Sequence, residues 1–304
     1  MGQKYRPNYW KNAALLTGSD VVLRLAGLGL RIGLANALGG EGMGLYQLVL
    51  AVYSLFITLA TAGVSVAATR LMAEELSGPD SVRGAARGML RRLLAAGLLL
   101  GLFAALLQLA TADLAARLWL GDVRAVGALR VSALGMPWMA VSAVLRGFFI
   151  ARRHVAPNVF SQLTEQTVRI ALVALALTRT EGLAVGVRCM LVLGATAVSE
   201  AVSALCMLAF YRRDARSAFA GQKAVRPADP ARRLWEILWP VEGGRVLASA
   251  LHTAENMLVP ACLAVYLANA GGRSAALEQY GVLKGMALPL LTFPFGLLGS
   301  LSVL

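Results

Sequence analysis

The sequence predicts an all-α membrane protein, a polytopic helical bundle with about eight spanning helices. Apolar residues make up 58% of the 304 residues and charged residues only 15%, whereas a soluble domain is nearer half apolar and a quarter charged. The apolar residues gather in runs of about 20 residues, the length that a helix needs to cross a bilayer. These runs do not alternate strictly between apolar and polar residues, so we expect helices rather than the strands of a barrel.

Eight apolar runs define the expected spans. They are 12–38, 44–69, 88–110, 125–151, 159–178, 184–210, 234–268 and 280–304. Three prolines lie inside the fourth and eighth runs, at Pro137, Pro289 and Pro294. Each proline removes a backbone hydrogen bond, so we expect kinks at these points.

The longest polar connection, 211–233, divides the chain unevenly. It is basic and contains Pro227 and Pro230, a composition typical of a linker. A short repeat supports the division, because LANALGG closes the first span at 34–40 and LANAGG closes the seventh at 267–272. The expected units are a six-helix lobe over 1–210, a cytoplasmic linker over 211–233 and the first two helices of a second lobe over 234–304. Since this second lobe stops after two helices, we also expect the chain to be truncated.

Lysine and arginine are distributed unevenly between the connections. If the N-terminus is cytoplasmic, the inner connections hold 17 of these residues and the outer connections 4. The positive-inside rule therefore predicts a cytoplasmic N-terminus. A net charge of +13 would also suit nucleic acid, but the clustering in loops between spans favours membrane topology and attraction to anionic lipids, with no nucleic-acid partner.

The first expected span carries three charged residues, Asp20, Arg24 and Arg31. At 100° per residue they lie along one side of a helix. A lipid-facing arginine near the middle of a span, as Arg24 would be, costs at least about 2.5–3.5 kcal/mol on insertion scales. We therefore expect this edge to face protein or a water-filled cavity. The alternative is an internal Asp20–Arg24 pair that only tethers helices.

The fifth and seventh spans also contain charged residues. Glu165 and Arg169 are one turn apart, so they either neutralise each other or form a cavity wall for an ionic ligand. Arg245 lies near the cytoplasmic end of the seventh span, where an arginine can snorkel to the surface. Glu255 lies near the centre of that span, where we expect a functional role.

Two further charged residues lie in the fourth and sixth spans. Arg146 is near the inner end of its span, so we expect it at the membrane interface. Glu200 is alone in its span, and a hydrogen bond that packs two helices is as good an explanation for it as a functional role.

The motifs of common enzyme and metal sites do not occur in the sequence. Neither histidine belongs to an HExxH motif, the three cysteines have no CxxC spacing, and no GxSxG occurs. A filter-like loop or a ring of charges typical of a channel is also missing. We therefore expect neither an enzyme nor a metal or cofactor. Inward-facing arginines instead suit an anionic substrate such as a phosphate or carboxylate.

Several short motifs resemble those of one family. The segment 40–47 reads GEGMGLYQ and is followed by YSLF at 53–56 and TAG at 61–63. Further matches are Arg146-Gly147-Phe148-Phe149, Pro157, Ser161-Gln162 through Glu165-Gln166 to Val168-Arg169, Glu255-Asn256 to Pro260, and YGVLKGMALP at 280–289. From about residue 12 to its end, the chain resembles the stage V sporulation protein B group of polysaccharide-transport proteins. That group belongs to the multidrug/oligosaccharidyl-lipid/polysaccharide exporter superfamily.

The resemblance implies two six-helix lobes, usually with fourteen spans in all, around a V-shaped central cavity. It also implies alternating access that carries an undecaprenyl-pyrophosphate-linked oligosaccharide, such as lipid II, across the bacterial cytoplasmic membrane. In related lipid II flippases arginines of the first helix line the cavity, and Arg24 and Arg31 occupy that kind of position here. The candidate substrate-binding residues are Arg24, Arg31, Glu165, Arg169, Arg245 and Glu255. The departure from the family is length, because spans nine to fourteen are missing.

Three functional hypotheses follow. The first is a flippase for lipid-linked oligosaccharides in cell wall or polysaccharide biosynthesis, whose partners are the lipid-linked anionic glycan and membrane lipids. The second is a drug/cation antiporter of the same fold, which would need a net acidic cavity around Glu165 or Glu255. The third is a membrane scaffold or truncated fragment that does not transport.

Overall fold

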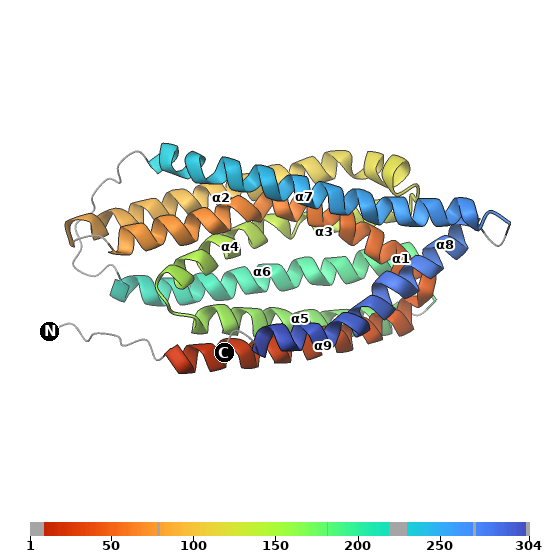
Figure 1. The fold of residues 1–304 in the computed structure, drawn as a ribbon, viewed down its shortest axis with the longest axis horizontal. Helices are drawn as coiled ribbons and strands as arrows, with labels where there is room; N and C mark the ends of the chain where they lie inside the picture. The colour runs from red at the N-terminus through yellow and green to blue at the C-terminus, as the bar shows by residue number, and fades with distance from the viewer. Residues whose placement is uncertain (1–8, 78–79, 181, 219–229, 270–271, 302–304) are drawn as a thin grey trace.

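The computed structural model describes residues 9–77, 80–180, 182–218, 230–269 and 272–301. Every regular element in these ranges is a helix. Figure 1 shows the long helices lying roughly side by side in one elongated bundle. The predicted all-α membrane bundle is therefore confirmed.

The first two expected spans form one element, α1 (Tyr9–Ser77), which is kinked at Gly39. Gly39 has φ 71° and ψ −179°, a conformation that residues with a Cβ rarely adopt. In Figure 1 the second half of α1 runs back at an angle to the first half. The chain therefore turns between the first two expected spans at a single glycine, and residues 39–43 form no separate loop.

The remaining elements follow in chain order and include two π-helical segments, η1 and η2. They are α2 (Asp80–Leu114), η1 (Ala115–Trp119), α3 (Ala125–Ala133), α4 (Met136–Ala151), α5 (Ala156–Arg179), α6 (Val185–Ala218), α7 (Pro230–Tyr266), α8 (Gly272–Tyr280), η2 (Gly281–Ala287) and α9 (Leu288–Leu301). The fourth expected span is thus the pair α3 and α4, bent by 42° just before Pro137. The eighth expected span, 280–304, is η2 and α9, with its π-helical segment shortly before Pro289, and α8 occupies the connection that was expected before this span. These two irregular stretches lie beside Pro137 and Pro289, as predicted, whereas α9 continues through Pro294 without a break.

By length and composition, four described helices can cross a membrane, or five if the bent pair is one span. The first of these apolar stretches, Leu15–Leu76, has 62 residues and contains two of the expected spans. Helix α5 is outside this set although its 24 residues reach about 36 Å at 1.5 Å per residue. Its charged and amide side chains lower its hydropathy, so its place in the bundle rests on contacts with α6, α1 and α4.

The expected linker over 211–233 is largely helical in its described part. Helix α6 continues to Ala218 and α7 begins at Pro230. The central part, 219–229, lies outside the described residues. The division into two lobes stays a prediction.

Buried apolar side chains form two clusters with a polar layer between them. One cluster surrounds the kink of α1 and contains Met43 and Leu129. The other lies at the far end of α1 and contains Leu71 and Phe148. The stretches between the two clusters are polar in part, with hydroxyl or charged groups at 61–65 of α1, 142–146 of α4 and 199–203 of α6. This layer positions the candidate site.

Helix α7 packs along the second half of α1 and closes one side of the polar layer. The hydroxyl of Thr253 donates to the carbonyl of Ala51 at 3.0 Å. Nearer the start of α7, Glu242 Oε2 accepts a hydrogen bond from the backbone N–H of Gly63 at 2.5 Å. In Figure 1 α7 lies beside the orange half of α1, in agreement with these contacts.

Candidate functional site

Four charged side chains from three helices form an ion-pair cluster in the polar layer. This polar cluster consists of Arg146 of α4, Glu165 and Arg169 of α5, and Glu200 of α6. Arg169 Nη2 lies 2.6 Å from Glu165 Oε1 and 3.1 Å from Glu200 Oε1. Arg146 Nη2 lies 2.9 Å from Glu165 Oε2. Glu165 therefore joins both arginines, and its side chain is only 13% exposed.

Hydroxyl and amide groups add further hydrogen bonds to the two arginines, although Arg146 Nε is buried without a partner among the described residues. Arg146 Nη2 also donates to Ser203 Oγ at 3.5 Å, and that hydroxyl lies 2.8 Å from Ser161 Oγ. Arg169 donates from Nε to Ser199 Oγ at 3.4 Å and from Nη1 to Gln166 Oε1 at 3.3 Å. Buried charges are tolerated when they are paired and hydrogen-bonded in this way.

The formal charges of the polar cluster cancel, so the cluster is neutral as a unit. Two guanidinium groups face two carboxylates, and both carboxylates accept from Arg169. The sequence left open whether Glu165 and Arg169 neutralise each other or offer a wall to a ligand. The structure shows the neutralised pair and adds a third and fourth partner from neighbouring helices.

An open cavity of about 230 Å³ adjoins the polar cluster. It lies between α1, α4, α6 and α7. Its polar lining residues are Thr61, Ser65, Ser142, Arg146, Glu200 and Arg245. Arg245 is exposed and makes no ion pair with the described part of the chain. Of the residues predicted from the sequence, Arg245 lines this cavity. Glu165 and Arg169 do not line it, but they pair with Arg146 and Glu200, which do.

The predicted arginines of α1 lie elsewhere. Arg24 Nε is 3.0 Å from Asp20 Oδ2, in the internal pair that the sequence offered as the alternative, and both side chains are nearly half exposed. Arg31 is also exposed and has no ion pair within the described ranges. The first half of α1 approaches α5 at Gly27, whose added Cβ would lie 4.0 Å from Gln166 Nε2. The two arginines therefore flank a helix contact beside the polar cluster but do not line its cavity.

Glu255 is separated from the other candidates. Its side chain is 63% exposed, and its contact in the described structure is with His252 Nδ1 at 3.4 Å on the same helix. One residue further, Asn256 turns inward and accepts from the hydroxyl of Tyr280 at 3.1 Å. The two neighbours point in different directions because successive residues on a helix are 100° apart.

Sequence reasoning placed Arg146 near the inner end of its span, at the membrane interface. The structure shows its guanidinium in the polar cluster, where it contacts Glu165 of α5 and Ser203 of α6. Glu200 was left undecided and is now paired with Arg169. One signal in the sequence was available for both. Each is an isolated charge inside an apolar run, which needs a partner from another helix.

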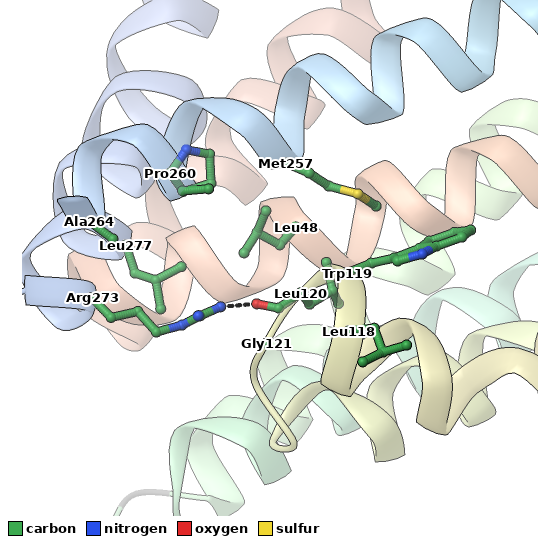
Figure 2. Close-up of a pocket in the computed structure, with 11 residues that line it drawn as sticks. Leu48, Leu118, Trp119, Leu120, Gly121, Met257, Pro260, Ala264, Arg273 and Leu277 are labelled. Atoms are coloured by element: carbon green, nitrogen blue, oxygen red, sulfur yellow. Dashed lines mark hydrogen bonds between the residues drawn. The ribbon is translucent and has the colours of Figure 1, made fainter.

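Two other cavities lie away from the polar cluster. The first, of about 190 Å³, lies between the π-helical η1, α7 and α8. Figure 2 shows the guanidinium of Arg273 there, reaching from α8 to the carbonyl of Leu120. The second is an apolar groove of about 550 Å³ between the first half of α1 and α5.

The groups that line the cavity suit the recognition of a charged ligand. In the described ranges no group of three or more His, Cys, Asp and Glu side chains is arranged to hold a metal ion. The carboxylates are held by arginines, so neither is poised as a free base or nucleophile. The cavity instead presents guanidinium and hydroxyl groups, which suit an oxyanion.

Comparison with known proteins finds a matching family model and several similar proteins. A model of the family described as polysaccharide biosynthesis protein matches residues 9–263. Stage V sporulation protein B of Bacillus subtilis (strain 168) is 28% identical over 302 residues, which cover 98% of this chain and 57% of the relative. Lipid II flippase MurJ of the same organism is 26% identical over 164 residues, which cover 51% of this chain and 30% of the relative. The chain spans a little over half the length of the first of these relatives.

Solved structures share the fold. An inward-facing multidrug resistance MATE family transporter of the MOP superfamily matches with a TM-score of 0.63 at 16% identity, over 95% of this chain and 60% of that one. The MATE multidrug transporter DinF-BH in complex with R6G matches with a TM-score of 0.57 at 15% identity, over 97% of this chain and 66% of that one. At these identities the likeness concerns the fold alone, and it supports a multi-pass membrane bundle.

Proposed function

The chain belongs to the polysaccharide biosynthesis protein family, and we propose that it serves to move a lipid-linked anionic glycan across the bacterial cytoplasmic membrane. The substrate class is an oligosaccharide on an undecaprenyl-pyrophosphate carrier, as in lipid II. The movement would follow alternating access, in which the cavity opens first inward and then outward. The lipid tail stays in the bilayer while the head group passes along the polar layer.

The observation that carries this proposal is the arginine-lined cavity within the membrane-spanning part of the bundle. Charges at this depth are costly, and they are kept where they serve a ligand path or pair with each other. Here most of them pair, whereas Arg245 lines the cavity without an ion pair in the described chain and interacts with the Glu242 carboxyl only at longer range. An anionic head group supplies the missing partner.

We assign the six candidate residues different parts in this function. Arg245 contacts the head group in the cavity, while Glu165 and Arg169 hold the cavity wall in place. Arg24 and Arg31 lie on the exposed side of the first half of α1, where they meet the pyrophosphate as it enters or leaves. Glu255, exposed on α7, is assigned to the same outer path.

A drug/cation antiporter is less well supported. It needs an acidic cavity with a carboxylate free to bind a proton or cation. Glu165 and Glu200 are each held by an arginine, and Glu255 lies outside the cavity that adjoins the polar cluster. The multidrug transporters among the structural neighbours share the fold at 15–16% identity, which carries no substrate with it.

The test is translocation of a fluorescent undecaprenyl-pyrophosphate disaccharide in proteoliposomes containing the purified chain. We expect transfer between leaflets, slowed at least about tenfold by Arg245→Ala and by Arg24→Ala, which corresponds to 1.4 kcal/mol. Arg130→Ala is the matched control, because Arg130 pairs with Asp113 on the exposed surface. A second readout is thermal stabilisation by the same lipid compared with neutral undecaprenol. Absence of both transfer and stabilisation would overturn the proposal.

A further inference from the structure

The expected outer connections between spans meet at one end of the bundle. Arg124, in the connection expected over 111–124, pairs with Glu41 beside the kink of α1 at 2.8 Å. In the same connection, the carbonyl of Leu120 accepts a hydrogen bond from Arg273 of α8. Helix α8 follows the linker and belongs to the second expected lobe. Residues of the two expected lobes are therefore tied together at this end.

Helices α7 and α8 are attached differently to the first expected lobe. Side chains of α7 are bonded to α1 at several points along the helix, among them Arg233, Glu242 and Thr253. In the described part of the chain, α8 makes one side-chain hydrogen bond to that lobe, and Arg273 donates it. The hydroxyl of Tyr280, at the other end of α8, is bonded to α7 instead. The polar attachment of α8 to the first expected lobe therefore depends on Arg273.

A glycine makes room for the guanidinium of Arg273. Gly121 has φ 59°, and a Cβ added there would lie 2.5 Å from Arg273 Nη1. Both the backbone conformation and the available space therefore favour glycine at this position. Leu120 caps the end of η1, where carbonyls lose their helical donors, so its oxygen can accept from the guanidinium. Arg273 also attracts the Asp122 carboxylate at longer range.

The packing beside this hydrogen bond is incomplete. A cavity of about 190 Å³ lies between η1, α7 and α8, and Figure 2 shows Arg273 extended from α8 to the carbonyl of Leu120. The other side chains in the lining, such as Leu118, Met257 and Leu277, are apolar. The walls of a void lose the contacts that filled space would give them. Separating α8 from η1 therefore costs less than separating close-packed helices.

On its other side, α8 meets the kink region of α1 at very short range. A Cβ added to Gly44 would overlap the backbone of Leu277, and one added to Gly281, directly after α8, would lie 2.1 Å from the carbonyl oxygen of Gly40. Glycines allow the backbones of two helices to approach this closely. In this arrangement no head group passes between α1 and α8, so the outer end of the bundle is closed here.

We propose that Arg273 is the latch of an outer gate, whose hydrogen bond to the Leu120 carbonyl holds α8 against the kink of α1 and keeps the outer end closed. The hinge is Gly272, the first residue of α8, which has φ 57°. Hinges are element-terminal residues of this kind, which absorb large changes of backbone angle. When the guanidinium leaves Leu120, α8 swings away from α1 while α7 stays attached. The latch rests on the proposed function, because alternating access requires one end to close while the other admits the head group.

The exposure of the latch allows it to open without unfolding the bundle. The side chain of Arg273 is exposed, so water replaces the carbonyl as the partner of the guanidinium when the hydrogen bond breaks. The ion pairs around Glu165 are buried, and breaking them would leave charges without partners. The polar cluster therefore fixes the helices of the first expected lobe, whereas the contact of Arg273 can be broken and remade.

The test measures how fast a water-soluble maleimide reaches a cysteine placed under α8 in the purified, detergent-solubilised chain. Leu277 is buried against Gly44, so Leu277→Cys reports the separation of α8 from α1. The natural cysteines are first replaced by serine, at Cys189, Cys206 and Cys262. Leu129→Cys, at a buried position in the first expected lobe, is the reference in the same background.

We expect Arg273→Ala to raise the labelling rate at position 277 about tenfold, the effect of losing one hydrogen bond from a charged donor on the open population. The rate at position 129 should not change. Arg273→Lys, which keeps the charge and a donor, should give an intermediate rate. Because Arg273 is exposed, these variants are expected to fold. A rate at position 277 that is equal with and without the arginine, or that rises equally at position 129, would overturn the latch.

A second variant leaves Arg273 itself unchanged. Gly121→Ala places a Cβ where the guanidinium lies, so labelling at position 277 should rise as it does for Arg273→Ala. Gly182→Ala is the matched control, because Gly182 also has a positive φ, of 88°, but an added Cβ meets nothing within 4 Å. Equal labelling in these two glycine variants would assign the effect to backbone strain and refute the latch.

The labelling and the translocation assay fail separately. A chain that moves no lipid-linked disaccharide but shows labelling that depends on Arg273 would refute the proposed function and leave the latch standing without that cargo. A chain that moves the disaccharide, with labelling and transfer both unchanged by Arg273→Ala, would refute the latch and leave the proposed function standing.

Discussion

Arg188 of α6 donates from Nη1 to the carbonyl oxygen of Ala37 at 2.9 Å, two residues before the kink of α1 at Gly39. Carbonyls in the turn before a helix break lose their usual amide donors, so a guanidinium can take their place. The same side chain donates from Nε to the carbonyl of Thr180 at 3.1 Å, where α5 ends. Arg188 therefore ties the kink of α1 to the adjoining ends of α5 and α6.

Replacing this arginine should weaken the kink. For Arg188→Ala we expect a loss of about 1.5–3 kcal/mol, the range for a hydrogen bond to a charged group. Arg179→Ala, an exposed arginine at the end of α5, is the control. The measurement is thermal unfolding in detergent. Equal midpoints for the two variants would show that the contact with Ala37 does not stabilise the fold.

Glu165 should be the most sensitive residue of the polar cluster. Glu165→Gln removes the charge that pairs with both Arg146 and Arg169, and uncompensated buried charges cost about 3–5 kcal/mol. Glu236→Gln is the comparison, because Glu236 pairs with Arg232 on an exposed helix surface where such pairs contribute about 0–1 kcal/mol. Thermal unfolding of both variants decides the matter. A loss for Glu165→Gln no larger than that for Glu236→Gln contradicts a stabilising role.

Asp122 should make stability depend on acidic pH. Burial by itself raises the pKa of the Asp122 carboxyl, but hydrogen bonds from Arg124 outweigh burial and hold the pKa below its ordinary value of about 3.9. A carboxyl with a depressed folded-state pKa stabilises the fold above its unfolded pKa, and this stabilisation is lost as the pH falls toward the folded pKa. Arg124 also binds Glu41 at 2.8 Å, so the interaction joins the loop before α3 to the kink region.

The corresponding measurement compares the natural chain with Asp122→Asn between neutral pH and about pH 3.5. We expect the variant to unfold at a lower temperature above about pH 5, and the gap between the two midpoints to shrink as the pH falls through 4. A gap that stays constant over this range would mean that Asp122 stabilises the loop by shape alone.

Gly44 allows α8 to approach α1 closely. A Cβ added at Gly44 would overlap the backbone of Leu277, which cannot move aside as a flexible side chain would. We expect Gly44→Ala to cost about 1–3 kcal/mol through overpacking. At Gly33, on the same helix, a Cβ meets nothing within 4 Å, so Gly33→Ala should be neutral or stabilising by up to about 1 kcal/mol. Thermal unfolding that ranks the two variants in the reverse order would contradict this helix contact.

The candidate site could be predicted only in part. The sequence indicated Glu165 and Arg169 as a pair because their i, i+4 spacing is a local property, and the structure confirms their contact. It also indicated Arg245, which lines the cavity, and Glu255, which lies away from it. The rotation of α7 about its own axis decides which of its residues line the cavity, and that rotation depends on packing against α1.

The sequence by itself determined that this is a multi-pass, all-α membrane protein with irregular backbone beside Pro137 and Pro289. Hydropathy, turn residues and the cost of unpaired backbone groups in a bilayer act over windows of about 20 residues, so they can be read locally. Only the tertiary structure decided that Arg146 and Glu200 complete the cluster around Glu165 and Arg169. Ion pairs need atoms within about 4 Å of each other, and helices from distant parts of the chain reach that distance only once their crossing and rotation are set.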